Sequence, residues 1–230
     1  METQLEEMGR FFDARIDHYD EHMLDLFQDF DLYYDTIADA ISPTQNPIRI
    51  LDLGCGTGAE LEPIFRRAPN AVVTGVDVSI KMLDKLREKH ESRAAQLHLI
   101  HDSYLTAPLG ISDFDCVVSI YTMHHFTLAV KLGLYQKIFQ SLKPGGQYIE
   151  GDCVVTQEKE QQVWDYYAKL HPHALKSMLH KMSTADPLLH IDLPCTVPTQ
   201  MRLFREAGFA KVDLVWHRED EESAIFVATP

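Results

Sequence analysis

The chain has 230 residues, of which 45% are hydrophobic and 24% charged, a composition typical of one globular domain with an appended segment. It excludes disordered, collagen-like and coiled-coil proteins. The net charge of -14 disfavours a nucleic-acid partner, and the lack of an apolar run of about 20 residues or a signal-like N-terminus argues against membrane insertion and secretion. The four cysteines form no Cys-x-x-Cys pair, so we expect reduced thiols and a cytoplasmic location.

The first 41 residues are acidic and have a helical pattern. Residues 1–40 contain twelve acidic side chains and two arginines, and apolar residues recur among them at steps of three and four. We therefore expect a helical N-terminal cap over residues 1–41, with Tyr19 or Tyr34 reaching a ligand. Prolines at positions 43 and 47 break the pattern and mark the start of the main domain, residues 42–230.

From residue 48 onward, apolar runs of strand length alternate with segments of helical period, which indicates parallel βαβ units. Strands are predicted at 48–53, 72–76, 97–101, 116–120 and 147–153. Helices are predicted at 59–67, 80–90 and 128–142. Ser79 is expected to cap the second of these helices, and Pro144-Gly145-Gly146 to stop the third and turn into the next strand.

The last third of the chain is predicted to hold a helical insert at about 155–200 and a hairpin. The insert has helical stretches at 158–170 and 173–181, and a short helix at 199–207 precedes Gly208, which is expected to cap it. Runs at 211–216 and 224–228 are expected to form an antiparallel hairpin. The predicted fold class is α/β, a Rossmann-like seven-stranded sheet that is mostly parallel, with a C-terminal antiparallel hairpin and a helical N-terminal cap.

A glycine-rich loop joins the first predicted strand to the following helix. Residues 50–61 read ILDLGCGTGAEL, and a ligand can approach such a loop closely at the carboxyl end of a parallel strand. Asp77 directly follows the second strand, where a carboxylate can accept hydrogen bonds from a ribose. A dinucleotide fingerprint requires a third glycine where Ala59 or Glu60 stands, so the loop disfavours a nicotinamide cofactor.

Several motifs follow one another over residues 48–153. The glycine loop and Asp77 are followed by Asp102-Ser103, by DCVVSIYTMHHF at 115–126 and by LKPGG at 142–146. Together they resemble class I S-adenosylmethionine-dependent methyltransferases. The resemblance implies an enzyme that uses S-adenosyl-L-methionine to methylate a small-molecule acceptor. It also implies a set of cofactor-binding residues: Tyr34, Asp52, Gly54, Cys55, Gly56, Asp77, Val78, Met82, Asp102, Ser103 and Ile120.

The acidic N-terminus and the C-terminal tail are similar to the tRNA uridine carboxymethyltransferase branch, whose cofactor is carboxy-S-adenosylmethionine. This likeness implies a tRNA base as the alternative acceptor. That branch places an arginine on the extra carboxylate, whereas no arginine lies between Arg93 and Arg202, which favours methyl transfer. A non-catalytic cofactor-binding module, a nicotinamide-dependent oxidoreductase and a homodimer are left open.

Methyl transfer depends mainly on alignment, and a general base is needed only where the acceptor must lose a proton. His124 and His125 follow the fourth strand and are the expected bases, with Tyr121 as the alternative catalytic group. A histidine here can instead cap the next helix or pack under the N-terminal cap. Glu150 and Asp152, at the end of the fifth strand, are expected either to orient the acceptor or to cap a helix.

One pair of side chains raises the question of a metal. His190 and Asp192 point the same way if their segment is extended. Two donors do not make a metal site, so no metal is expected.

Overall fold

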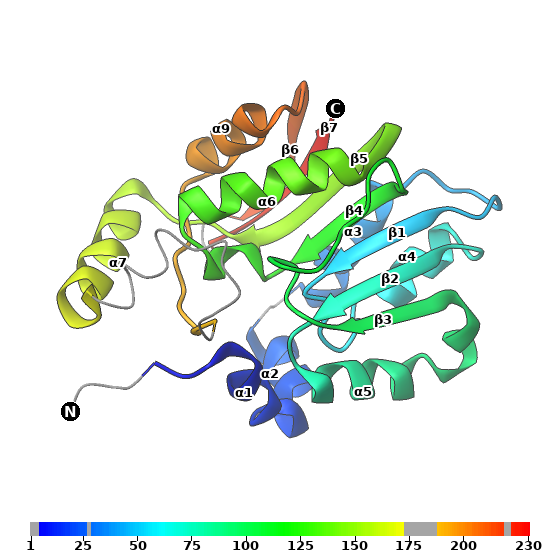
Figure 1. Cartoon of the computed structure of the whole chain (residues 1–230), viewed down its shortest axis with the longest axis horizontal. Coiled ribbons are helices and arrows are strands. Elements are labelled where there is room, and N and C mark those ends of the chain that lie inside the picture. The colour runs from blue at the N-terminus through cyan, green and yellow to red at the C-terminus, as the bar shows by residue number, and fades with distance from the viewer. Residues whose placement is uncertain (1–4, 27–28, 173–187, 219–221) are drawn as a thin grey trace.

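The computed structural model describes residues 5–26, 29–172, 188–218 and 222–230. Seven strands form one sheet in the spatial order β3-β2-β1-β4-β5-β7-β6 (Figure 1). Their bounds are β1 (Arg49–Leu53), β2 (Val72–Asp77), β3 (Leu97–His101), β4 (Phe114–Ile120), β5 (Leu142–Cys153), β6 (Lys211–Arg218) and β7 (Ser223–Thr229). The strands β1 to β5 pair in parallel, and β7 pairs antiparallel with both β5 and β6. The predicted fold class is confirmed.

The strand order reverses between β1 and β4. From β1 the chain proceeds outward through β2 to β3 and then returns to β4 on the other side of β1. Connections therefore leave the carboxyl ends of β1 and β4 in opposite directions. In open α/β sheets such a reversal leaves a crevice at these ends, where ligands bind.

Helices cover both faces of the sheet, and others lie at the ends of the strands (Figure 1). The helices are α1 (Met8–Asp13), α2 (Tyr19–Leu26), α3 (Phe30–Asp39), α4 (Leu61–Arg67), α5 (Ile80–Lys89), α6 (Leu128–Ser141), α7 (Gln157–Leu170) and α9 (Val197–Ala207), with 3-10 turns at Ile16–His18, Glu91–Gln96 and Met123–His125. Side chains of α6 and α9 share one apolar core with the sheet, and those of α3, α4 and α5 share the other. None of the helices in the described ranges is both long and apolar enough to cross a bilayer.

The predicted ends of two helices are confirmed. The backbone N–H of Met82 donates to the Ser79 hydroxyl at 3.1 Å, which caps α5. Gly208 ends α9 with a φ of 114°, a left-handed conformation that glycine adopts without a Cβ penalty. The predicted helical stretch at 173–181 lies outside the described residues.

The predicted helix end and turn near residues 144–146 are confirmed in part. Helix α6 ends at Ser141, but β5 already begins at Leu142, which pairs with Phe114 at the start of β4. The register then shifts, so that Cys116 pairs with Gln147, and residues 143–146 have no partner on β4. Gly145, with a φ of 80°, lies in this irregular part of the strand. The turn preference therefore appears as an irregularity within β5 and not as a separate turn before it.

The N-terminal helices have two different places. Helix α3 buries Tyr33, Tyr34 and Ile37 against the sheet and so belongs to its core. Helices α1 and α2 instead lie beside the carboxyl ends of the parallel strands (Figure 1). Asp13 ties α1 to α5, because its carboxylate accepts a hydrogen bond from the Ser79 hydroxyl at 2.6 Å. Only the first part of the cap therefore covers the crevice.

Candidate active site

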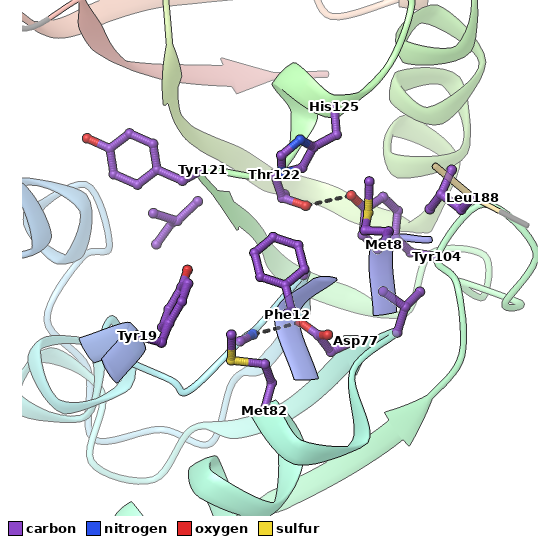
Figure 2. A pocket seen from close by; sticks show the side chains of 14 residues that line it. Met8, Phe12, Tyr19, Asp77, Met82, Tyr104, Tyr121, Thr122, His125 and Leu188 are labelled. Atoms are coloured by element: carbon purple, nitrogen blue, oxygen red, sulfur yellow. Dashed lines mark hydrogen bonds between the residues drawn. The ribbon is translucent and has the colours of Figure 1, made fainter. Parts of the chain in front are cut away.

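The glycine loop after β1 is held by the carboxylate after β2. Oδ2 of Asp77 accepts from the backbone N–H of Gly56 at 2.9 Å (Figure 2). Its Oδ1 accepts from the backbone N–H of Ser79 at 2.8 Å. Gly54 has a φ of 71°, and a Cβ on it would lie 2.5 Å from the Thr122 hydroxyl oxygen. A side chain at position 54 would therefore clash with the chain after β4.

Two further carboxyl groups are buried behind this loop. Burial raises the pKa of Asp52, and the charge and hydrogen bond of Glu60 raise it further. Burial also raises the pKa of Glu60. Among the described residues, Oδ2 of Asp52 and Oε1 of Glu60 have no hydrogen-bond partner. Buried acceptors without donors are rare, so the pair suits a ligand with a cationic or hydrogen-bonding group.

A small cavity of about 40 Å³ lies against the loop and the end of β2. Six of the residues predicted to bind a cofactor line it: Gly54, Gly56, Asp77, Val78, Met82 and Ile120. The cap supplies Met8, Phe12 and Tyr19, and the Phe12 ring points into the middle of the group (Figure 2). The cavity is small because cap side chains fill much of the crevice.

The other residues predicted to bind a cofactor lie outside this cavity. Tyr34 is buried in the core beneath α3. Cys55 points the other way, with its sulfur 2.8 Å from where a Cβ on Gly75 would stand, so the absence of a side chain there makes room for the thiol. Asp102 is exposed and accepts from the backbone N–H of Ser103 at 2.7 Å. The roles of these residues, and that of Asp52, stay predictions.

A second cavity, of about 540 Å³, adjoins the first. Four residues line both: Phe12, Tyr19, Tyr121 and His125. The rest of its lining comes from the cap, from the turn after β4, from the end of β5 and from the segment around residue 190: Phe11, Ala14, Arg15, His18, His22, Met23, His124, Cys153, His190 and Asp192. The large cavity therefore combines aromatic walls with a cluster of histidines.

His124 and His125 stand in this cluster, as predicted, but in different electrostatic surroundings. Nδ1 of His124 lies 2.5 Å from Oδ1 of Asp152. Burial by itself lowers the pKa of His124, but the Asp152 carboxylate outweighs it, and the pKa is well above its usual value. Burial and the charge of His124 lower the pKa of His125. We therefore expect a charged His124 and a neutral His125 at neutral pH.

Nδ1 of His125 lies 2.9 Å from the carbonyl oxygen of Ile191 and 3.1 Å from Oδ1 of Asp192. Burial by itself would raise the pKa of Asp192, but the hydrogen bond and charge of the histidines lower it to about 2. His190, whose pKa burial lowers to about 4, stacks on Phe11 with ring centroids 3.5 Å apart. The segment after α7 thus closes the histidine end of the large cavity.

Tyr121, the third predicted catalytic residue, lies on the wall between the cavities. It has a φ of 48°, which is uncommon for a residue with a side chain. Its hydroxyl shares a hydrogen bond of 2.8 Å with Ser223, and its ring stacks on Tyr33. Burial raises the pKa of Tyr121, so it stays protonated at neutral pH. These contacts favour a structural role over proton removal.

The capping alternatives are wrong, because threonines cap the two helices concerned. Thr127 caps α6 and Thr156 caps α7. Asp152 instead holds His124, and the Tyr148 hydroxyl donates to buried Glu150 at 2.6 Å.

Most residues of the large cavity carry no site signal in the sequence, among them Phe12, Arg15 and Asp192. Phe12 belongs to the apolar pattern of the cap, Arg15 is one of two arginines in it, and Asp192 is half of the pair with His190. One feature of the sequence could have indicated Arg15: it is one of only two arginines among the twelve acidic residues of positions 1–40. No local pattern links Asp192 to His124, because 67 intervening residues separate them.

Comparisons with known proteins point to methyltransferases and related enzymes. Residues 50–146 match the sequence family described as a methyltransferase domain. A carboxy-S-adenosyl-L-methionine synthase of Trichodesmium erythraeum is 28% identical over 197 residues, which cover 79% of this chain and 75% of that protein. The expected likeness to the tRNA uridine carboxymethyltransferase branch stays a prediction.

Solved structures share the fold. A Nostoc punctiforme protein assigned as an O-methyltransferase superposes with a TM-score of 0.69 at 21% identity, over 99% of this chain and 63% of that one. Human N-acetylserotonin methyltransferase in complex with S-adenosylmethionine gives a TM-score of 0.59 at 15% identity, over 86% of this chain and 51% of that one. The chain thus spans less than two thirds of either solved protein.

Proposed function

Because the chain carries a methyltransferase domain of the class I, S-adenosylmethionine-dependent type, we propose that it methylates a small molecule held in the large cavity. The expected enzyme class, a methyltransferase, and its expected cofactor, S-adenosylmethionine, are confirmed. The observation that carries the proposal is the wall of four residues shared by the two cavities, Phe12, Tyr19, Tyr121 and His125. A cofactor beside the glycine loop would present its methyl group across that wall.

The residues around the small cavity fit the parts of S-adenosylmethionine. Asp77 lines the cavity and can accept hydrogen bonds from the ribose hydroxyls. Behind the glycine loop, outside that lining, the buried pair Asp52 and Glu60 suits the amino group of the methionine portion. Ligand pockets usually measure about 300–1,000 Å³, whereas this cavity measures about 40 Å³. The cap must therefore shift Phe12 out of the crevice when the cofactor binds.

The large cavity fits an acceptor with an aromatic or apolar body and one polar group. Phe11, Phe12 and Tyr19 provide the apolar walls, while His124 and His125 stand at one end. S-adenosylmethionine supplies a methyl group on a sulfonium. A new bond from the acceptor oxygen to this methyl replaces the bond to sulfur, S-adenosylhomocysteine leaves, and the acceptor proton passes to the neutral His125. A neutral imidazole is suited to this task near neutral pH.

The curated relatives favour a second candidate, the synthesis of carboxy-S-adenosylmethionine. This reaction requires a cationic group for a carboxylate. Arg15 lines the large cavity, where it lies over the Phe11 ring and pairs with Glu6 at 3.1 Å. The cap can therefore supply the arginine that the sequence lacks between Arg93 and Arg202.

Two measurements test the proposal. Calorimetric titrations with S-adenosylmethionine, S-adenosylhomocysteine, carboxy-S-adenosylmethionine and NAD should show binding of the first two and none of NAD. A screen of hydroxylated aromatic acceptors, read by mass, should then show S-adenosylhomocysteine and an acceptor heavier by one methylene. Tight NAD binding would overturn the proposal. Formation of carboxy-S-adenosylmethionine from a carboxylate donor would establish the second candidate instead.

Three coarser expectations also remain proposals. A cytoplasmic location is supported by four free cysteine thiols, which suit a reducing compartment. The division at residue 41 is supported by the start of β1 at Arg49, although α3 packs in the core of the main domain. Fractionation of cells and proteolysis of the cap would test these two, and light scattering would show whether the protein is a homodimer.

A further inference from the structure

Three side-chain donors meet at the histidine end of the large cavity. Oδ1 of Asp192 lies 3.1 Å from Nδ1 of His125 and 3.5 Å from Nε2 of His124. Nε2 of His190 is 3.9 Å from the same oxygen. The donor atoms of His124, His125 and Asp192 lie within 4.8 Å of one another. Segments from two distant parts of the chain therefore bring two imidazoles and one carboxylate to a single point.

The spacing of these donors suits a tetrahedral ion. Zinc lies roughly 2.0–2.2 Å from its nitrogen and oxygen ligands, so two ligands at the tetrahedral angle are about 3.3–3.5 Å apart. The two distances to Asp192, 3.1 and 3.5 Å, fall close to this spacing. Nδ1 of His125 also donates to the carbonyl oxygen of Ile191 at 2.9 Å, so an ion that binds this nitrogen displaces its proton.

A buried carboxylate orients the central imidazole. Oδ1 of Asp152 lies 2.5 Å from Nδ1 of His124, which leaves Nε2 facing Asp192. Metal-binding histidines usually donate their second ring N–H to a carboxylate or carbonyl in this way. Among the described residues, Oδ2 of Asp152 has no hydrogen-bond partner, although it is buried. Asp152 therefore resembles the outer carboxylate of a metal centre.

The fourth direction is open to the cavity. His124, His125, His190 and Asp192 all line it, and the Asp192 side chain is 55% exposed, so an ion can enter from solvent. Catalytic zinc sites have three protein ligands and leave one position for water or substrate. We propose that His124, His125 and Asp192 bind a zinc-type divalent cation whose open position faces the acceptor cavity.

A cation here would change how the histidine pair acts on an acceptor. An ion would displace the Nε2 proton of the charged His124, so that both imidazoles become ligands. An acceptor hydroxyl at the open position would then become more acidic because of the ion's charge. The site thus favours acceptors with a hydroxyl or carboxylate oxygen. This consequence rests on the proposed function, whereas cation binding itself does not.

The test uses full-length, metal-free protein without cofactor or acceptor, titrated with Co²⁺ and followed by visible absorption. We expect one Co²⁺ per chain, with the ligand-field bands of a four-coordinate nitrogen and oxygen site, and displacement by Zn²⁺. Asp192→Asn should weaken Co²⁺ binding by more than 100-fold, and Asp192→Glu should restore part of it. Asp152→Asn should weaken binding about 10- to 100-fold.

Two control variants decide where an ion binds. His98 is exposed on β3, outside the residues that line the cavity, and His98→Asn should leave Co²⁺ binding unchanged. Cys153→Ser separates our site from the neighbouring group of His124, Asp152 and Cys153. A thiolate-to-cobalt charge-transfer band that this variant removes would overturn the proposal, and so would the absence of binding or equal binding by Asp192→Asn. None of these results depends on methyl transfer, so the proposed function is tested separately.

Discussion

The two cavities that share Phe12, Tyr19, Tyr121 and His125 are built differently. The small one takes Gly54, Gly56, Asp77, Val78 and Met82 from a single βαβ unit that spans β1 to α5. The large one takes its lining from the cap, the turn after β4, the end of β5 and the segment around residue 190. A cofactor site can therefore be encoded by a short motif, whereas the acceptor site depends on segments that meet only after folding.

The largest effect is expected at the wall between the cavities. His125→Gln removes the imidazole but keeps a hydrogen-bonding side chain of similar size. If the two cavities have separate tasks, methyl transfer should fall about 10²- to 10⁴-fold while cofactor affinity changes little. Initial rates and calorimetry on the same preparation measure both. An equal loss in binding would show that the cavities do not work separately.

A smaller effect is expected within the small cavity. Asp77→Ala should weaken S-adenosylmethionine binding by about 1 to 3 kcal/mol through loss of hydrogen bonds to the charged carboxylate. Asp77→Asn should lose less binding free energy, because its amide oxygen can still accept from the backbone N–H of Gly56. Asp84→Ala on α5 is the matched control, since Asp84 is exposed, pairs with Arg87 on the same helix and does not line the small cavity. Unchanged affinity in Asp77→Ala would reject the ribose assignment.

The cap should control access to the small cavity. Phe12→Ala removes the ring that fills the crevice and its edge contacts with Tyr19 and His125. A larger fraction of the molecules then has an open cofactor crevice, so the association rate for S-adenosylmethionine should rise roughly several-fold. Stopped-flow fluorescence measures this rate. A slower association would indicate that the ring helps to form the cofactor site.

The smallest effect concerns the core behind the large cavity. Burial, and next the charge of Asp152, raise the pKa of Glu150 from 4.5 to about 8. The folded protein then binds more protons than the unfolded chain between these values, so Glu150 makes stability fall as pH rises from 4.5 to 8. Glu150→Gln should remove this fall, which urea unfolding at the two ends of the range would detect. If the free energy of unfolding changed with pH in the same way in Glu150→Gln and in the unsubstituted protein, the raised pKa of Glu150 would be contradicted.

Much of the fold could be predicted because its signals are local. Apolar runs separated by helical periods defined the parallel strands. Ser79 caps α5 with its hydroxyl, and Gly208 ends α9 because it lacks a Cβ and so adopts a left-handed conformation. The start of β5 could not be predicted for the opposite reason. Leu142 pairs with Phe114, 28 residues away, so the strand begins before Pro144 and the two glycines, which form an irregularity within it.

The sequence by itself determined the glycine loop and the position of the carboxylate beside it, because both depend on neighbours in one βαβ unit. Only the tertiary structure decided that Phe12 fills the cofactor crevice, that Arg15 lines the acceptor cavity and that Asp192 meets His124 and His125. These contacts join segments that are far apart in the sequence, and no hydrophobic period or motif spacing connects them. They form because the cap and the segment around residue 190 pack against the main domain, and this packing fixes where each backbone lies.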